Sequence, residues 1–72
     1  MSLFHERLKQ LRTEKSVMQK DLAELLKVTP RAMRNYESGL HEPSYDNLIA
    51  LADYFDVSID YLVGRSDDPE RH

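Results

Sequence analysis

Three side chains suited to hydrogen-bonding with nucleobases follow Pro30 within one short segment. Arg31 and Arg34 are followed directly by Asn35, and no acidic residue intervenes. A guanidinium can donate two hydrogen bonds to guanine, and a carboxamide can pair with adenine in a similar two-point manner. On a helix, residues three and four apart are neighbours, so we expect these side chains to face outward together. Their chemistry and spacing fit the major groove of duplex DNA.

The residues around this segment predict a short helix over 30–38. Thr29 is a good N-cap because its hydroxyl can accept a hydrogen bond from an otherwise unpaired backbone N–H. Pro30 suits the first helical position, where a missing N–H costs nothing. Met33 and Tyr36 form a single apolar edge that can anchor the helix. Gly39 then provides a C-terminal stop of the usual kind.

A second short helix is predicted immediately upstream, over 19–26. Its apolar residues have the spacing of one helical stripe and are Leu22, Ala23, Leu25 and Leu26. A corner of about three residues, as in helix-turn-helix motifs, separates the two predicted helices. The alternative is an ordinary helical hairpin with a solvated, charged outer face. The short corner and the basic outer face favour a helix-turn-helix.

Composition limits the class of protein. The chain has 72 residues, two glycines and no cysteine, so we expect one all-α domain, without disulfides, in the cytoplasm. No apolar run approaches the roughly 20 residues of a membrane-spanning helix, and no signal peptide is expected. No glycine-rich phosphate loop or nucleophile motif is present. We therefore expect no enzyme activity and no cofactor.

The net charge of −3 is unevenly distributed along the sequence. Residues 1–40 carry eight Lys and Arg against five acids, whereas residues 41–72 carry two against eight acids. Attraction to phosphates acts within a Debye length of roughly 8–10 Å, so the basic half matters more for DNA than the total. We expect the acidic half to provide solubility and to weaken non-specific binding.

Five helices are predicted in all. Besides those over 19–26 and 30–38, they cover about 3–15, about 45–55 and a short stretch after Ser58. Ser44 and Ser58 are the expected N-caps of the last two. We expect residues 1–64 to form the domain, and residues 65–72, which are charged and lack apolar side chains, to be a mobile tail.

The chain resembles the Cro/repressor-type, or xenobiotic-response-element, helix-turn-helix family from about Phe4 to Gly64. The resemblance rests on the order and spacing of RLKQLR (7–12), Gln19 with Leu22-Ala23, Val28-Thr29, YESG (36–39), Pro43, Asn47-Leu48 with Leu51-Ala52, and VSIDYL (57–62). It implies a compact five-helix bundle of the lambda-repressor-like type. It further implies a transcriptional regulator, a repressor, that binds an inverted-repeat operator in double-stranded DNA as a homodimer.

The resemblance also implies roles for individual residues. Base contacts are expected from Pro30, Arg31, Arg34 and Asn35, with Arg34 also within reach of a phosphate. Phosphate contacts, which position a protein without selecting sequence, are expected from Gln19, Thr29, Ser38 and Ser44. The resemblance pairs Arg12 with Glu37, which would hold the first helix to the third. The alternative is two independent surface charges.

Three residues depart from the family pattern. Lys27 and Ser16 stand at corners where glycine is usual, and Lys27 is expected to adopt a positive φ at a cost of about 1 kcal/mol. Met18 stands where a serine or threonine would cap the second helix. These departures predict lower stability and affinity, and no change of function.

Other residues allow alternative interpretations. Tyr54, Ile59, Tyr61 and Val63 either form a dimer surface or complete a small core. Three histidines, His5, His41 and His72, lack metal-site spacing, so no metal is expected, and no small-molecule ligand is evident. The alternatives to a DNA-binding regulator are a protein-interaction module, such as an antitoxin or antirepressor on the same fold, and a small enzyme.

Overall fold

The structure is a computed structural model that describes residues 4–71, and it contains five helices. The helices are α1 (Phe4–Glu14), α2 (Gln19–Leu26), α3 (Pro30–Ser38), α4 (Tyr45–Phe55) and α5 (Ile59–Leu62). The described residues contain no strand. The predicted all-α, five-helix class is confirmed. Helix α1 ends at Glu14, one residue earlier than expected, and Leu3 lies outside the described residues.

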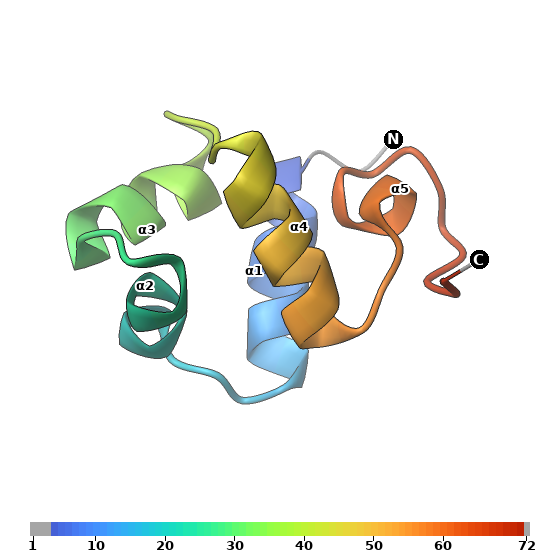
Figure 1. The fold of residues 1–72 in the computed structure, drawn as a ribbon, viewed down its shortest axis with the longest axis horizontal. Coiled ribbons are helices and arrows are strands. Elements are labelled where there is room, and N and C mark those ends of the chain that lie inside the picture. The colour runs from blue at the N-terminus through green and yellow to red at the C-terminus, as the bar shows by residue number, and fades with distance from the viewer. Residues whose placement is uncertain (1–3, 72) are drawn as a thin grey trace.

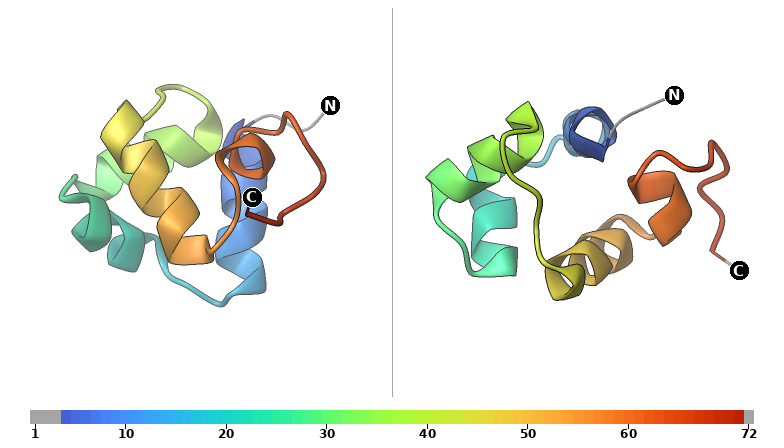
Figure 2. Two further views of the ribbon diagram at one scale, coloured as in Figure 1. Left: turned by 45° about the vertical axis from the view of Figure 1, so that its right-hand side comes forward. Right: turned by 90° about the horizontal axis from the view of Figure 1, so that it is seen from above.

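The helices divide the molecule into two ends joined by a central pair (Figure 1). Helices α2 and α3 lie at one end, and α5 with the C-terminal segment lies at the other. Helices α1 and α4 lie between these ends, and the views in Figure 2 show that they occupy different depths. The helix-turn-helix is therefore presented at one extremity of the long axis of the molecule.

Local sequence explains where the helices begin. The hydroxyl of Thr29 accepts a hydrogen bond from the N–H of Ala32 at 3.0 Å. Ser44 and Ser58 act in the same way for α4 and α5, at 3.2 and 3.0 Å. The expected caps are thus present, and each satisfies a backbone donor that helix geometry leaves unpaired.

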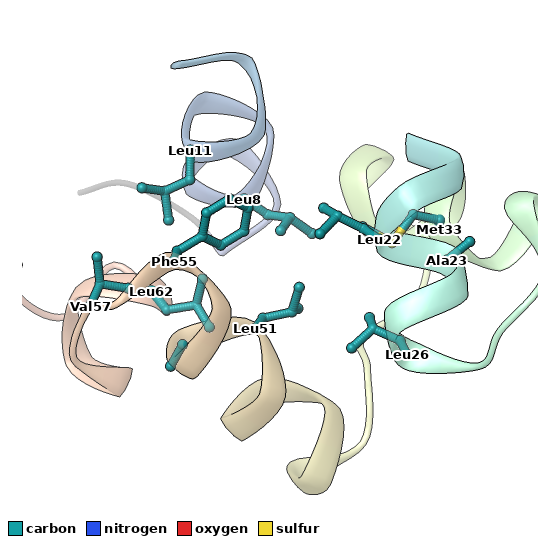
Figure 3. Close-up of a cluster of buried hydrophobic side chains, with 11 residues drawn as sticks. Leu8, Leu11, Leu22, Ala23, Leu26, Met33, Leu51, Phe55, Val57 and Leu62 are labelled. Atoms are coloured by element: carbon teal, nitrogen blue, oxygen red, sulfur yellow. The ribbon is translucent and has the colours of Figure 1, made fainter. Parts of the chain in front are cut away.

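One apolar core holds the helices together (Figure 3). Each helix contributes one large side chain that is fully buried. These side chains are Leu8, Leu22, Met33, Leu51 and Leu62. Burial of such a side chain contributes about 1.5–3 kcal/mol relative to leaving it exposed. Met33 anchors α3 from beneath, which leaves the opposite side of that helix available to solvent.

Three non-glycine residues adopt left-handed backbone conformations. They are Ser16, Lys27 and Asp56, with φ between 55° and 58°. The positive φ of Lys27 agrees with the expectation from its corner position, whereas that of Asp56 was not expected. Each follows a helix end, where a left-handed residue lets the chain turn away and satisfies terminal carbonyls. This conformation costs free energy at these three positions, because each residue carries a Cβ.

The start of α2 compensates in part for its missing cap. Met18 provides no side-chain cap hydrogen bond. Its backbone N–H instead donates to the carboxylate of Asp21 at 3.4 Å. This is the reciprocal half of a capping box, so one end of α2 is stabilised without a serine or threonine.

Residues 65–71 run beside α5 (Figure 2), and Arg71 pairs with Asp53 near the end of α4. The N–H of Ser58 donates to the carbonyl of Pro69 at 3.1 Å. The boundary after residue 64 and the mobility of the tail stay predictions. No helix of the described part of the chain is long and apolar enough to cross a membrane.

Candidate nucleic-acid interface

Helix α3 presents its arginines to solvent at the end of the molecule. Pro30, Arg31 and Arg34 are all exposed. Within residues 4–71, neither arginine has an ion-pair or hydrogen-bond partner. Both guanidinium groups thus keep their full set of donors for an external acceptor.

Asn35 is placed differently from the two arginines because it is half-buried. Its backbone carbonyl accepts hydrogen bonds from Gly39 and Leu40, the latter at 3.0 Å, and so ends the helix. Its side-chain amide has no partner among the described residues. Asn35 therefore lies closer to the scaffold than Arg31 and needs an acceptor that approaches the helix closely.

The predicted phosphate-binding hydroxyls stand at helix ends. Thr29, Ser38 and Ser44 are exposed. Thr29 and Ser44 each accept an N-cap hydrogen bond, and the Ser38 hydroxyl donates to the Asn35 carbonyl at 3.1 Å. The hydroxyl protons of Thr29 and Ser44 stay available, so both can still donate to an anion.

A three-way contact fixes α3 to the other helices. The Arg12 guanidinium donates to both carboxylate oxygens of Glu37, from Nε at 2.5 Å and from NH2 at 3.1 Å. The Gln19 amide donates to the same carboxylate at 3.1 Å. Arg12 also donates from NH1 to the carbonyl of Val17 at 3.0 Å. One carboxylate thus joins α1, α2 and α3.

The burial of this contact has an electrostatic consequence. The side chains of Glu37 and Arg12 are 4% and 19% exposed. Glu37 is the acid nearest to the outer face of α3 in sequence, and its charge is neutralised within the scaffold. Two-point pairing of guanidinium and carboxylate also fixes direction, so it sets the angle at which α3 is held. The structure therefore brings Arg12 and Glu37 together, and it adds Gln19, which was expected at a phosphate, to the same carboxylate.

The end of α3 is tightly enclosed by α1. Gly39 has φ of +85° and caps the helix, and a Cβ built at this position would lie 3.0 Å from the His5 ring. A side chain at residue 39 would meet both backbone strain and this ring. His5 and Gly39 thus determine how the chain leaves α3.

Arg7 is an important residue that the sequence did not single out. It is 4% exposed, its guanidinium lies 3.8 Å from the centroid of the Tyr61 ring, and its NH2 donates to Asp67 at 3.0 Å. Its Nε and NH1 are buried without a hydrogen-bond partner. In the sequence, Arg7 has the pattern of an ordinary charged helix residue, and its partners lie more than 50 positions away. No local signal could have found it.

One cleft lies apart from the predicted DNA-contacting side chains. Its volume is about 530 Å³, and residues from α1, α3, the α3–α4 loop, α4 and the segment after α5 line it, among them Phe4, His5, Tyr36, His41 and Arg65. None of the predicted DNA-contacting residues lines this cleft. No group of three or more His, Asp or Glu within residues 4–71 could hold a metal ion, and His72 lies outside the described residues.

The surface proposed for dimer contacts is partly open. Tyr54 is 48% and Ile59 is 37% exposed, whereas Tyr61 and Val63 are half-buried. Tyr61 packs against the core and beneath Arg7. Tyr61 therefore fits the interpretation as part of a small core. Tyr54 and Ile59 remain accessible, as the interpretation as a dimer surface requires.

Comparisons with known proteins agree with this geometry. A family model described as helix-turn-helix matches residues 8–62. The chain is 35% identical over 68 residues to YobD of Bacillus subtilis, an uncharacterised HTH-type transcriptional regulator. This alignment covers 94% of the chain and 61% of YobD.

Two solved structures have the same fold. A transcriptional regulator from Listeria innocua is 44% identical, with a TM-score of 0.83 over 85% of this chain and 57% of that one. The P22 c2 repressor, solved with a synthetic operator, is 29% identical, with a TM-score of 0.82 over 92% of this chain and all of that one. The chain thus spans less than two thirds of the length of YobD and of the Listeria regulator.

Proposed function

This chain belongs to the helix-turn-helix family of the Cro/repressor type, and from that membership we propose that it binds specific duplex DNA to regulate transcription, as a repressor. The observation that carries the proposal is the pair of unpartnered, exposed arginines on α3, beside a glutamate whose charge is neutralised internally. Such a face attracts phosphates and leaves guanidinium donors available for bases. No catalytic activity is proposed.

The relatives support the same function. YobD and the Listeria protein are named as transcriptional regulators. The P22 c2 repressor shares the fold at 29% identity, and its structure contains a synthetic operator. Action on duplex DNA also implies a cytoplasmic location for this chain.

Within this proposal, α3 enters the major groove. Arg31 and Asn35 lie one helical turn apart and contact base edges, with Asn35 the more deeply placed of the two. Pro30 has no backbone donor, and its apolar ring suits the methyl group of thymine. Arg34 contacts a base or the adjacent phosphate.

The hydroxyls and Gln19 fix the position of α3 along the duplex. Thr29 and Ser44 are exposed at helix N-termini, where the dipole and free N–H groups favour anions, and Ser38 is exposed at the C-terminal end of α3. Gln19 uses one amide N–H for Glu37 and can donate the other to a phosphate. These contacts hold the register and do not select sequence.

The proposed active species is a homodimer that forms through α4 and α5. Two copies of α3 would then enter successive major grooves about 34–36 Å apart and bind an inverted repeat. The accessible side chains of Tyr54 and Ile59 support this assignment.

Selection of bound duplexes from a random pool tests the proposal. The expected result is an enriched inverted repeat whose half-sites are spaced by one helical turn. Arg31→Ala combined with Arg34→Ala should abolish enrichment, whereas Arg65→Ala, at the far end of the molecule, should not. Absence of enrichment and of binding to any duplex at low salt would leave the protein-interaction module as the better interpretation.

A further inference from the structure

The corner between α2 and α3 contains a residue whose backbone conformation is unfavourable for its type. Lys27 has φ of 58° and ψ of 43°, which is the left-handed conformation, and it caps the C-terminal end of α2. This conformation costs free energy in a residue that carries a Cβ, whereas glycine adopts it freely. Strained residues of this kind cluster at functional sites. A side chain at this position therefore needs a reason that glycine could not provide.

The other two non-glycine residues in this conformation differ from Lys27. Asp56 is of a residue type that visits the left-handed region, and its carboxylate pairs with Arg71 at 3.5 Å. Ser16 has a short polar side chain. The long side chain of Lys27 is exposed and forms no hydrogen bond or ion pair within residues 4–71. No polar contact of the described residues thus offsets the strain at Lys27.

Lys27 continues the basic surface of α3 towards α2. From residue 25 to residue 36 the sequence contains no acid, and this stretch holds three cations, Lys27, Arg31 and Arg34. All three are exposed, and the charge of the next acid, Glu37, is neutralised within the scaffold. The ammonium of Lys27 is therefore free to attract the same polyanion as the two arginines.

Lys27 is also close enough to Thr29 to bind an anion together with it. Two residues span at most about 7 Å between Cα atoms. The lysine ammonium is a point charge with three donors on a flexible four-carbon stem, so it can reach an anion beside its second neighbour in the chain. Thr29 is exposed, and its hydroxyl proton is available. This corner lies at the end of the molecule where α3 begins (Figure 1).

We propose that Lys27 is a phosphate-binding residue of the DNA interface, whose ammonium contacts the same backbone phosphate as Thr29. The inference rests on the proposed function and adds a contact to it. A lysine binds phosphate as a point charge, and such a contact fixes the start of α3 on the duplex without selecting bases. Glycine at residue 27 would relieve the strain and remove the contact.

The proposal predicts opposite effects of one substitution on stability and on DNA binding. Lys27→Gly should unfold at a higher temperature than the parent because the strain is relieved, and it should bind duplex DNA less tightly because the ammonium is lost. Lys27→Gln keeps the Cβ and the strain, so it should lose affinity without a gain in stability. Lys27→Arg keeps the charge and should bind as the parent does.

Fluorescence anisotropy of the full chain at several salt concentrations tests the proposal. The probes are the duplex enriched from the random pool and a scrambled duplex of the same composition. Loss of one phosphate contact lowers the salt slope by about 0.9, so the deficit of Lys27→Gln should shrink about threefold between about 50 and 200 mM salt. The deficit should be equal on both duplexes, because a phosphate contact carries no sequence information. Lys9→Gln, which removes an exposed lysine of α1, is the matched control.

The outcomes separate this inference from the proposed function. An equal deficit on both duplexes that decreases with salt, with parent-like binding of Lys9→Gln, would support the Lys27 contact. Parent-like affinity and salt slope in Lys27→Gln would overturn it, and so would an equal deficit in Lys9→Gln or a deficit confined to the enriched duplex. If the parent and Lys27→Gln select the enriched duplex equally well, the proposed function stands and the Lys27 contact fails. A parent that binds no duplex overturns both.

Discussion

The two ends of the molecule use arginine in opposite ways. At the helix-turn-helix end, Arg31 and Arg34 are exposed and have no partner among the described residues. At the other end, Arg7 is buried over an aromatic ring and Arg71 bridges two acids. The same side chain therefore serves as an available ligand in one region and as a fixed contact in the other.

This difference shows why net charge alone misleads for this chain. All of the acidic excess lies in residues 41–72, where several carboxylates are engaged with arginines of the same region or with Arg7. Arg12 removes the charge of Glu37 from the vicinity of α3. A chain with net charge −3 can thus present a basic face, because the pairing of charges is local.

Breaking the Arg12–Glu37 pair, which holds α3 to α1, should have the largest effect on stability. Arg12→Ala leaves Glu37 buried without its cation, and loss of one partner of a buried pair costs about 3–5 kcal/mol. We expect a corresponding fall in the free energy of unfolding, measured by urea denaturation. Lys9→Ala, an exposed position on the same helix, is the control. Parent-like stability of Arg12→Ala would mean that the pair does not hold α3.

Removal of an unpartnered arginine should change binding and leave folding intact. Arg31→Ala should weaken binding to the selected duplex by about 1–3 kcal/mol, the value of a two-point base contact, with unchanged thermal stability. Fluorescence anisotropy at fixed salt measures the loss, and Arg65→Ala serves as the control. Equal losses in both variants would remove the distinction between the two ends.

A substitution of Tyr61, whose ring lies beneath Arg7, should lower stability and leave DNA affinity unchanged. Tyr61→Leu removes the ring below Arg7 while it keeps an apolar side chain, so the cation–π contribution of about 1 kcal/mol is lost. Calorimetry should show reduced stability, whereas the affinity of the folded protein for a half-site should not change. A weakened half-site complex with parent stability would contradict this assignment.

The smallest expected effect is a gain in stability. Lys27→Gly relieves a left-handed residue at the corner of the motif and should stabilise the fold by about 0.5–1 kcal/mol. Lys20→Gly, within α2, is the opposite control and should destabilise by a similar amount. Thermal unfolding distinguishes the two. A destabilised Lys27→Gly variant would show that the corner is not strained.

Much of the fold was predictable because its signals are local. The hydroxyl caps at residues 29, 44 and 58 and the proline at the first position of α3 each act within one helical turn. The left-handed Asp56 escaped prediction, since an aspartate at a helix end has several favourable conformations.

The sequence predicted the candidate site only where the family resemblance or the pattern within one helix indicated the position of a side chain. The outward placement of Arg31 and Arg34 follows from helical periodicity, and the Arg12–Glu37 pair was implied by resemblance. The half-burial of Asn35 was not predicted, because helical periodicity placed Asn35 outward with the two arginines. The burial of Arg7 depends on Tyr61 and Asp67, which only the complete fold brings near, so no pattern within one helix could indicate it.

The absence of partners for Arg31 and Arg34 among the described residues has a consequence for how such a protein can diversify. Side chains that contribute nothing to folding can be exchanged without loss of the scaffold, because Met33 and Glu37 anchor α3 from its other side. A library varied only at residues 31 and 34 should therefore yield many folded members with new operator preferences. The chain is in this sense a ready starting point for engineering orthogonal genetic switches.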